Sequence, residues 1–92
     1  MTSLMTTPTL HIHLKYFASV REAMGQGSEQ VDTAAGTVGA LRDSLVARGG
    51  AAADSLARGR AVRAALNQVM CADDAVLTEG CEVAFFPPVT GG

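Results

Sequence analysis

The sequence predicts one α+β domain in which a β-sheet packs against helices. Residues 10–17 alternate strictly between two faces, Thr37 precedes an apolar stripe at helical spacing, and residues 82–86 form a short apolar segment that two prolines end. A period of two is the signature of a half-buried strand, whereas spacings of three and four residues mark one face of a helix. The order strand, helix, strand, helix and late strand is typical of α+β domains.

The first strand is expected over residues 10–17, and its two faces differ in chemistry. The face expected to meet the core carries Leu10, Ile12, Leu14 and Tyr16. The opposite face carries His11, His13, Lys15 and Phe17. Ser19 and Glu22 then stand three residues apart as in a capping box, which predicts a short helix that stops at Gly25. Residues 29–33 fit a second strand.

A second helix is expected to begin after Thr37. The threonine is a good N-cap residue, and Val38, Leu41 and Leu45 follow at positions that share one helical face. Gly49 and Gly50 are expected to end this helix, because glycine adopts the left-handed conformation that closes many helices.

The later part of the chain is less regular. Residues 51–59 are rich in small side chains and indicate a connector with one helical turn around Leu56. Residues 60–70 fit a strand and a helix equally well, so periodicity alone leaves both open. Residues 82–86 are expected to form a strand, which ends at residues 87–88 because proline cannot donate to a ladder.

The charge balance argues against nucleic acid and membranes as partners. The net charge is −2 and the seven Lys and Arg residues are scattered, whereas phosphate binding needs clustered basic side chains. No apolar run approaches the length of a membrane span. Residues 1–8 have neither a basic start nor an apolar segment, so we expect no secretion signal and a cytoplasmic location.

Cysteine and histidine provide no strong site. Cys71 and Cys81 allow a disulfide on count alone, but free thiols are expected in the cytoplasm. Neither cysteine has a nearby histidine, so there is no zinc motif. His11 and His13 share a strand face, but two ligands make a weak metal site and a solvated face is the simpler interpretation. We expect no bound metal.

The chain is expected to divide into three parts. Residues 1–9 are expected to form a disordered polar extension and residues 10–86 the folded domain. Residues 87–92 are expected to form an extended, flexible tail that ends in Gly91 and Gly92. An inert, disordered end is the simplest interpretation of such a tail, because chain termini are often disordered.

A chemical role for the tail is the competing interpretation. Pro87 and Pro88 stiffen its root, and Gly91 and Gly92 lack a Cβ atom, so the tip can enter a narrow channel. The reactive group is the carboxylate of Gly92. An ionised carboxylate resists nucleophiles, so it needs activation, for which adenylation by ATP is the usual route. A sulfide donor can then replace AMP and leave a thiocarboxylate.

The last eleven residues, EVAFFPPVTGG, closely resemble the C-terminus of the molybdopterin synthase small subunits, the MoaD family. Supporting resemblances lie at residues 16–22, 37–42, 65–68 and 77–80, so that residues 10–92 are covered. The family implies a ubiquitin-like β-grasp fold: a mixed sheet of four or five strands with a helix packed across it. It also implies strands within residues 60–70. Many relatives have Asn-Gly where this chain has Asn67 and Gln68, which makes a tight type I′ turn less favourable here.

The resemblance also implies a function in molybdenum cofactor biosynthesis. An ATP-dependent enzyme would adenylate Gly92, and a sulfurtransferase system would convert it to a thiocarboxylate. The tail, comprising Pro87, Pro88, Val89, Thr90 and Gly91, would enter the large subunit of molybdopterin synthase. There Gly92 would donate sulfur to cyclic pyranopterin monophosphate. Two small and two large subunits would form a heterotetramer and supply both dithiolene sulfurs.

In that scheme the small subunit is not catalytic alone and binds no cofactor itself, because the activating enzyme uses the ATP. Phe17 and Phe86 are expected on the outward face of the sheet, where they would dock the large subunit together with Met70.

Other functions remain open at this level. Sulfur carriers for thiazole or cysteine synthesis share the fold and the terminal Gly-Gly, although their tails usually lack this Phe-Phe-Pro-Pro-Val-Thr run. A ubiquitin-like modifier would instead join Gly92 to lysines of other proteins. A plain binding module with an inert tail would lose nothing when Gly91 and Gly92 are removed.

Overall fold

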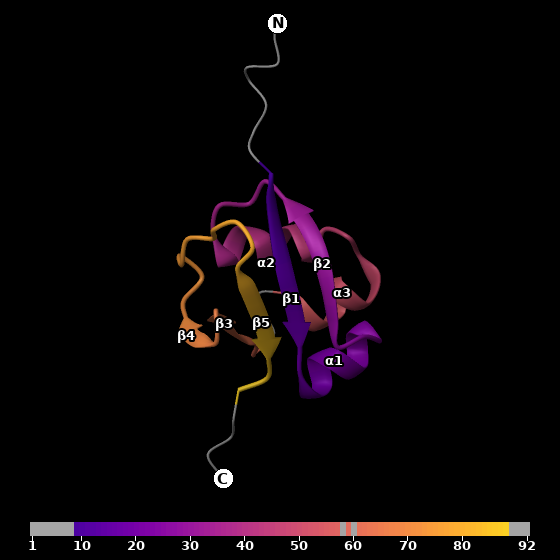
Figure 1. The fold of residues 1–92 in the computed structure, drawn as a ribbon. Helices are drawn as coiled ribbons and strands as arrows, with labels where there is room; N and C mark the ends of the chain where they lie inside the picture. The colour runs from indigo at the N-terminus through magenta and orange to yellow at the C-terminus, as the bar shows by residue number, and fades with distance from the viewer. Residues whose placement is uncertain (1–8, 58, 60, 89–92) are drawn as a thin grey trace, which may run out of the picture.

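The computed structural model describes residues 9–57, 59 and 61–88, which form a mixed β-sheet with helices packed on it (Figure 1). The elements in chain order are β1 (Leu10–Tyr16), α1 (Ala18–Met24), β2 (Ser28–Thr33), α2 (Val38–Val46), α3 (Gly50–Leu56), β3 (Arg63–Leu66), β4 (Val69–Cys71) and β5 (Glu82–Phe86). The sheet has five strands in the order β2-β1-β5-β3-β4. β1 and β5 run parallel, and all other neighbours are antiparallel.

This arrangement is the ubiquitin-like β-grasp fold that the resemblance implied. Helices α2 and α3 lie behind the sheet in Figure 1, and α1 lies at the end of the sheet where β1 and β5 finish. Residues 60–70, which fitted helix and strand equally well, contain β3 and β4. The opposite face of the sheet carries no helix of the described residues, and it is called the outer face below.

The core lies between the sheet and the helices. In β1, Ile12, Leu14 and Tyr16 are buried while the residues between them are exposed, which confirms the predicted alternation. The other core side chains come from all three helices, from β3 and β5 and from the loop before β5: Val20, Val38, Leu41, Leu45, Leu56, Ala64, Leu77, Cys81, Val83 and Phe85. Since β5 is the middle strand, the core fixes the last strand before the tail.

Helix α2 begins where the sequence predicted. The Thr37 hydroxyl accepts a hydrogen bond from the Ala40 N–H at 3.2 Å. The N–H of Val38, the first residue of the helix, donates to the Ala75 carbonyl at 3.0 Å, in the loop before β5. The helix ends at Val46, three residues before Gly49. The chain then reverses at Gly49 and Gly50, which both have positive φ.

Helix α1 begins differently from the prediction, and the proposed Ser19 cap is wrong. Phe17 stands at the N-cap position with no side-chain cap. It continues the extended path of β1, because its N–H donates to the Phe85 carbonyl at 3.2 Å. The turn into the helix is made at Ala18, whose φ of 51° lies in the left-handed region. The predicted stop at Gly25 is confirmed, with φ of 76°.

Helix α3 is longer than the single turn that the sequence indicated. Ala52 and Leu56 are its buried residues and stand one turn apart. The end of the helix is held by Arg42 of α2, whose guanidinium donates to the carbonyls of Leu56 at 2.6 Å and Ala57 at 2.8 Å. A cation at the last carbonyls stabilises a helix C-terminus. This long-range contact is invisible in the local sequence.

The hairpin between β3 and β4 forms the tight turn that the sequence made less favourable. Asn67 and Gln68 both have positive φ, 50° and 71°, as a type I′ turn requires. Asn67 makes two hydrogen bonds with the backbone of Glu82. Its N–H donates to the Glu82 carbonyl at 2.8 Å, and its side-chain oxygen accepts a hydrogen bond from the Glu82 N–H at 2.9 Å. These two bonds to β5 explain why the turn forms without glycine.

Candidate functional site at the root of the tail

The tail leaves the domain from the middle of the sheet. β5 ends at Phe86, and Pro87 and Pro88 follow, both partly buried. Pro87 lines a shallow pocket of about 350 Å³ together with Val20 and Ala23 of α1 and with Val62. The tail therefore begins beside α1 and Val62. Val89, Thr90, Gly91 and Gly92 lie outside the described residues.

Two aromatic side chains lie side by side at this end of the outer face. The β1–β5 register places Tyr16 beside Phe85, and the hydrogen bond from Phe17 to the Phe85 carbonyl extends the ladder by one residue. Phe17 therefore lies next to Phe86. The side chain of Phe85 is wholly buried in the core, and neighbouring residues of a strand point to opposite faces. Phe86 thus belongs to the outer face, as the sequence predicted.

The next row of residues on the outer face, one row further from the tail, contains two small side chains. Ala84 of β5 pairs with Ala65 of β3, and Ala65 pairs with Met70 of β4. Both alanines are buried, and successive rows on one face of a sheet are about 7 Å apart. We define Phe17, Ala65, Met70, Ala84 and Phe86 as the tail-root patch.

The tail-root patch is apolar and partly open to water. Phe17 is 48% exposed and Met70 57% exposed, while Phe86 is partly buried. Contiguous exposed apolar surface of this kind often marks a protein interface. The patch thus brings together the three residues predicted from sequence to bind a partner. Ala65 and Ala84 were missed, because the identity of an alanine gives no sign of a binding surface, and only the strand register shows where it lies.

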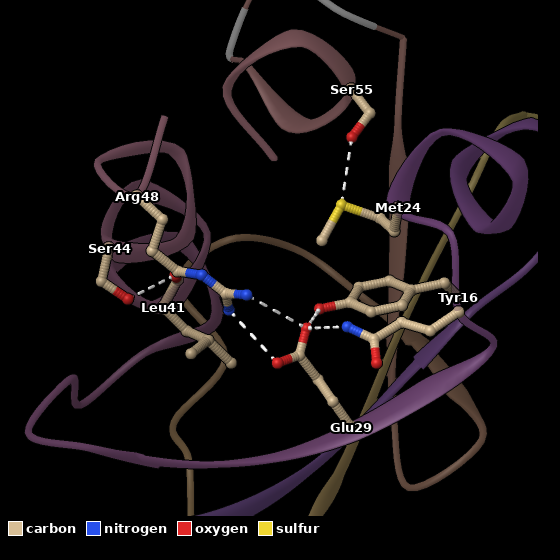
Figure 2. Close-up of polar contacts among 8 residues, drawn as sticks. Tyr16, Met24, Glu29, Leu41, Ser44, Arg48 and Ser55 are labelled. Atoms are coloured by element: carbon tan, nitrogen blue, oxygen red, sulfur yellow. Dashed lines mark hydrogen bonds and ion pairs between the residues drawn. The ribbon is translucent and has the colours of Figure 1, made fainter. Parts of the chain in front are cut away.

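A polar cluster on the helix-covered face of the sheet makes hydrogen bonds to the last residue of β1. Tyr16 donates a 2.7 Å hydrogen bond to the carboxylate of Glu29, which also accepts one from Gln26 at 3.1 Å and pairs with Arg48 at 3.3 Å (Figure 2). Burial, and then the hydrogen bond to Glu29, raise the pKa of the Tyr16 phenol well above its usual value. Tyr16 stays neutral, and it is the residue before Phe17, so the cluster holds one side of the tail-root patch in place.

Helix α1 is held to α3 near the same end of the molecule. The Ser55 hydroxyl lies 3.5 Å from the sulfur of Met24 (Figure 2).

On the outer face of the sheet, Lys15 and Glu82 form an ion pair at 3.7 Å. Because Lys15 pairs with Ala84 in the β1–β5 register, this ion pair borders the patch on its β1 side and on the side away from the tail.

The histidines and cysteines belong to no metal-binding cluster of the described residues. His11 lies between two carboxylates, 2.9 Å from Glu79 and 3.5 Å from Asp32. The His11 backbone N–H, as a hydrogen-bond donor, lowers the pKa of Glu79. Within the described part of the chain, no three His, Cys, Asp or Glu side chains are placed to share a metal ion.

The cysteines are both free thiols, and burial raises the pKa of Cys71. Such a thiol is a weaker nucleophile at neutral pH.

Among the same described residues, no helix is long and apolar enough to cross a membrane.

Comparison with known proteins supports the resemblance seen in the sequence. The ThiS family model matches residues 14–92. The chain is 44% identical over 81 residues to the molybdopterin synthase sulfur carrier subunit of Escherichia coli, which covers 88% of this chain and 99% of that protein. The protein of the same name from Mycobacterium tuberculosis is 38% identical over 85 residues, covering 90% and 99%.

A solved structure of similar fold comes from an archaeon. The crystal structure of SAMP1, a small archaeal modifier protein of Haloferax volcanii, has a TM-score of 0.72 and 30% identity, covering 89% of this chain and 99% of that one.

Proposed function

Because the chain belongs to the ThiS family, we propose that it is the sulfur-carrier small subunit of a molybdopterin synthase. The observation that carries the proposal is the position of the tail-root patch. The middle strand β5 ends within the patch, so a protein that covers the patch also lies where the last residues begin. The E. coli relative, 44% identical, carries this function in its name.

The chemistry we propose takes place at the carboxylate of Gly92. In an activating enzyme, a carboxylate oxygen attacks the α-phosphate of ATP and releases pyrophosphate, which gives a glycyl adenylate. A sulfurtransferase then supplies sulfide equivalents, the C–O bond to AMP breaks, and the C–S bond of a thiocarboxylate forms. ATP is consumed by the activating enzyme, so the small subunit needs no bound cofactor.

The sulfur is then used by the large subunit. The thiocarboxylate sulfur attacks a side-chain carbon of cyclic pyranopterin monophosphate, and a C–O bond at that carbon breaks, so that its oxygen leaves as water or stays with the phosphate. Water then cleaves the C–S bond to the glycine, which leaves the sulfur on the substrate and restores the carboxylate. Two turns with two loaded subunits complete the dithiolene, in keeping with a heterotetramer of two small and two large subunits. The described residues support this scheme indirectly: they offer a docking patch at the root of the tail rather than a pocket for the pterin.

The reach of the tail sets the geometry of this transfer. The six residues from Pro87 to Gly92 span at most about 20 Å when extended. Pro87, Pro88, Val89, Thr90 and Gly91 would pass through a channel in the large subunit, and the glycines allow it to be narrow. The tail-root patch, with Phe17, Met70 and Phe86, would seat the domain at the mouth of that channel.

Length variants of the tail test the proposal. Deleting Gly92 leaves a similar carboxylate about 3.5 Å short, and a displacement of about 1 Å can already cost on the order of a hundredfold in rate. Each variant would be incubated with the activating enzyme, ATP and a sulfide source, and then with the large subunit and pterin substrate. We expect both deletion of Gly92 and addition of one residue to abolish dithiolene formation without changing stability. Normal dithiolene formation by either variant would contradict the proposal.

A protein modifier is the second candidate, and the similarity to SAMP1 favours it. The activated Gly92 would then be captured by a lysine amine instead of sulfide. The recovery of Gly92 in isopeptide bonds from native cells would support that function. Carriers for thiazole or cysteine synthesis would be supported by co-purification with the corresponding synthase.

A further inference from the structure

Arg63 lies directly beside the tail-root patch. It is the first residue of β3, and the β3–β5 register pairs it with Phe86. Its neighbour Ala64 belongs to the core, so the alternation of the strand puts Arg63 on the outer face, where it is exposed. The last row before the tail therefore consists of Phe17, directly after β1, Phe86 of β5 and Arg63 of β3.

The guanidinium of Arg63 has no partner within residues 9–57, 59 and 61–88. Three other cations of the described chain are engaged, whereas Arg63 is not: Lys15 pairs with Glu82, Arg48 pairs with Glu29, and Arg42 binds backbone carbonyls. The carboxylate of β5 on the outer face, Glu82, is four residues before Phe86, which is about 13 Å along a strand. It is also held by Lys15. Among the described residues, Arg63 is thus a charge beside an apolar patch, and it pairs with no carboxylate.

We propose that Arg63 forms an ion pair with a carboxylate of the protein that covers the tail-root patch, which under the proposed function is the large subunit of the synthase. Side chains directly opposite in an antiparallel pair have Cβ atoms about 5 Å apart. A partner that packs on Phe86 must therefore come close to Arg63 and remove some of its water. An uncompensated charge at an interface is costly, whereas a carboxylate matches the planar guanidinium with two hydrogen bonds.

This pair would select the partner as well as help to bind it. The apolar patch offers little discrimination, because other apolar surfaces can cover it. A carboxylate placed opposite Arg63 fixes the orientation around the tail, and a surface with a cation or no charge there is disfavoured. The Asp or Glu is therefore expected on the rim of the channel that receives the tail, beside the site occupied by Phe86.

The test uses the full-length protein and the purified large subunit. Dissociation constants would be measured for the wild type, Arg63→Gln and Arg63→Lys at low and high salt. Gln30→Glu is the matched control, because it changes the net charge by the same unit on the same face but at β2, on the far side of β1. Thermal unfolding of each variant would show that the domain is intact, since Arg63 is exposed.

We expect Arg63→Gln to weaken binding about fivefold to tenfold at low salt, which corresponds to a lost interfacial charge pair. High salt should shrink the difference, because it screens the pair. Arg63→Lys should keep most of the affinity, and Gln30→Glu should have little effect. Equal affinities for Arg63→Gln and wild type, or equal losses for Arg63→Gln and Gln30→Glu, would overturn the inference.

The same measurements separate this inference from the proposed function. If the wild type binds the large subunit and Phe86→Ala weakens binding while Arg63→Gln does not, the ion pair is wrong and the docking patch stands. If the wild type does not bind the large subunit at all, both the function and the ion pair are refuted.

Discussion

Phe17 separates the contribution of the tail-root patch to folding from its contribution to docking. The residue is 48% exposed, so folding has removed only about half of its surface from water. Complete burial of a Phe side chain stabilises a protein by roughly 1.5–3 kcal/mol. Phe17→Ala should therefore lower the free energy of unfolding by about 1 kcal/mol.

The same substitution should have a larger effect on binding. The exposed half of Phe17 becomes buried when a partner covers the patch, and truncation of an aromatic anchor at the centre of an interface costs about 2 kcal/mol or more. That loss corresponds to roughly a thirtyfold weaker complex with the large subunit. Phe86→Ala should behave in the same way, because Phe86 lies beside Phe17 on the same face.

Phe85→Ala is the matched control, since it removes the same side chain from the opposite face of the sheet. Phe85 is fully buried, so its removal should cost about 3–5 kcal/mol of stability. Calorimetric titration would give the affinities, and chemical denaturation would give the unfolding free energies. The account of the patch fails if Phe17→Ala binds as tightly as the wild type. It also fails if Phe17→Ala unfolds as readily as Phe85→Ala.

Three further predictions concern stability. Gln68→Gly should raise the free energy of unfolding by about 0.5–1 kcal/mol in chemical denaturation, because φ of 71° strains a side chain. Arg42→Ala should lower it by about 3 kcal/mol, since two carbonyls lose their donor; Arg42→Lys should lose less. The pKa of Glu79 is lowered in the folded protein, so the ionised carboxylate stabilises the fold at pH values above the ordinary pKa of a Glu side chain. This contribution is lost as the pH falls and the carboxylate is protonated. Glu79→Gln should therefore flatten the acid limb of the stability profile; an unchanged limb would contradict the His11–Glu79 contact.

Local patterns predicted the elements whose neighbours in sequence decide their structure. The alternation of residues 10–17 and the Thr37 cap depend on period and local hydrogen bonding, and both were confirmed. The Ser19 cap was wrong because a contact with β5 keeps Phe17 extended and moves the helix start to Ala18. No pattern around Ser19 contains that contact.

Long-range contacts explain the other differences. The sequence predicts too short a helix α3, because the end of the helix is stabilised by Arg42, which lies fourteen residues before Leu56. The turn at Gln68 forms because Asn67 binds Glu82, fifteen residues later. In the candidate site, Phe17, Met70 and Phe86 were named from sequence, whereas Ala65, Ala84 and Arg63 required the strand register. A register is set by the whole sheet and is not encoded in any single strand.

Intact mass spectrometry of the protein purified from its native host tests the central claim most directly. If Gly92 carries sulfur, part of the protein should show the exchange of one terminal carboxylate oxygen for sulfur. That fraction should rise when the large subunit is absent and disappear when the activating enzyme is absent. A chain that carries only an unmodified carboxylate in the presence of the activating enzyme and the absence of the large subunit would contradict the account.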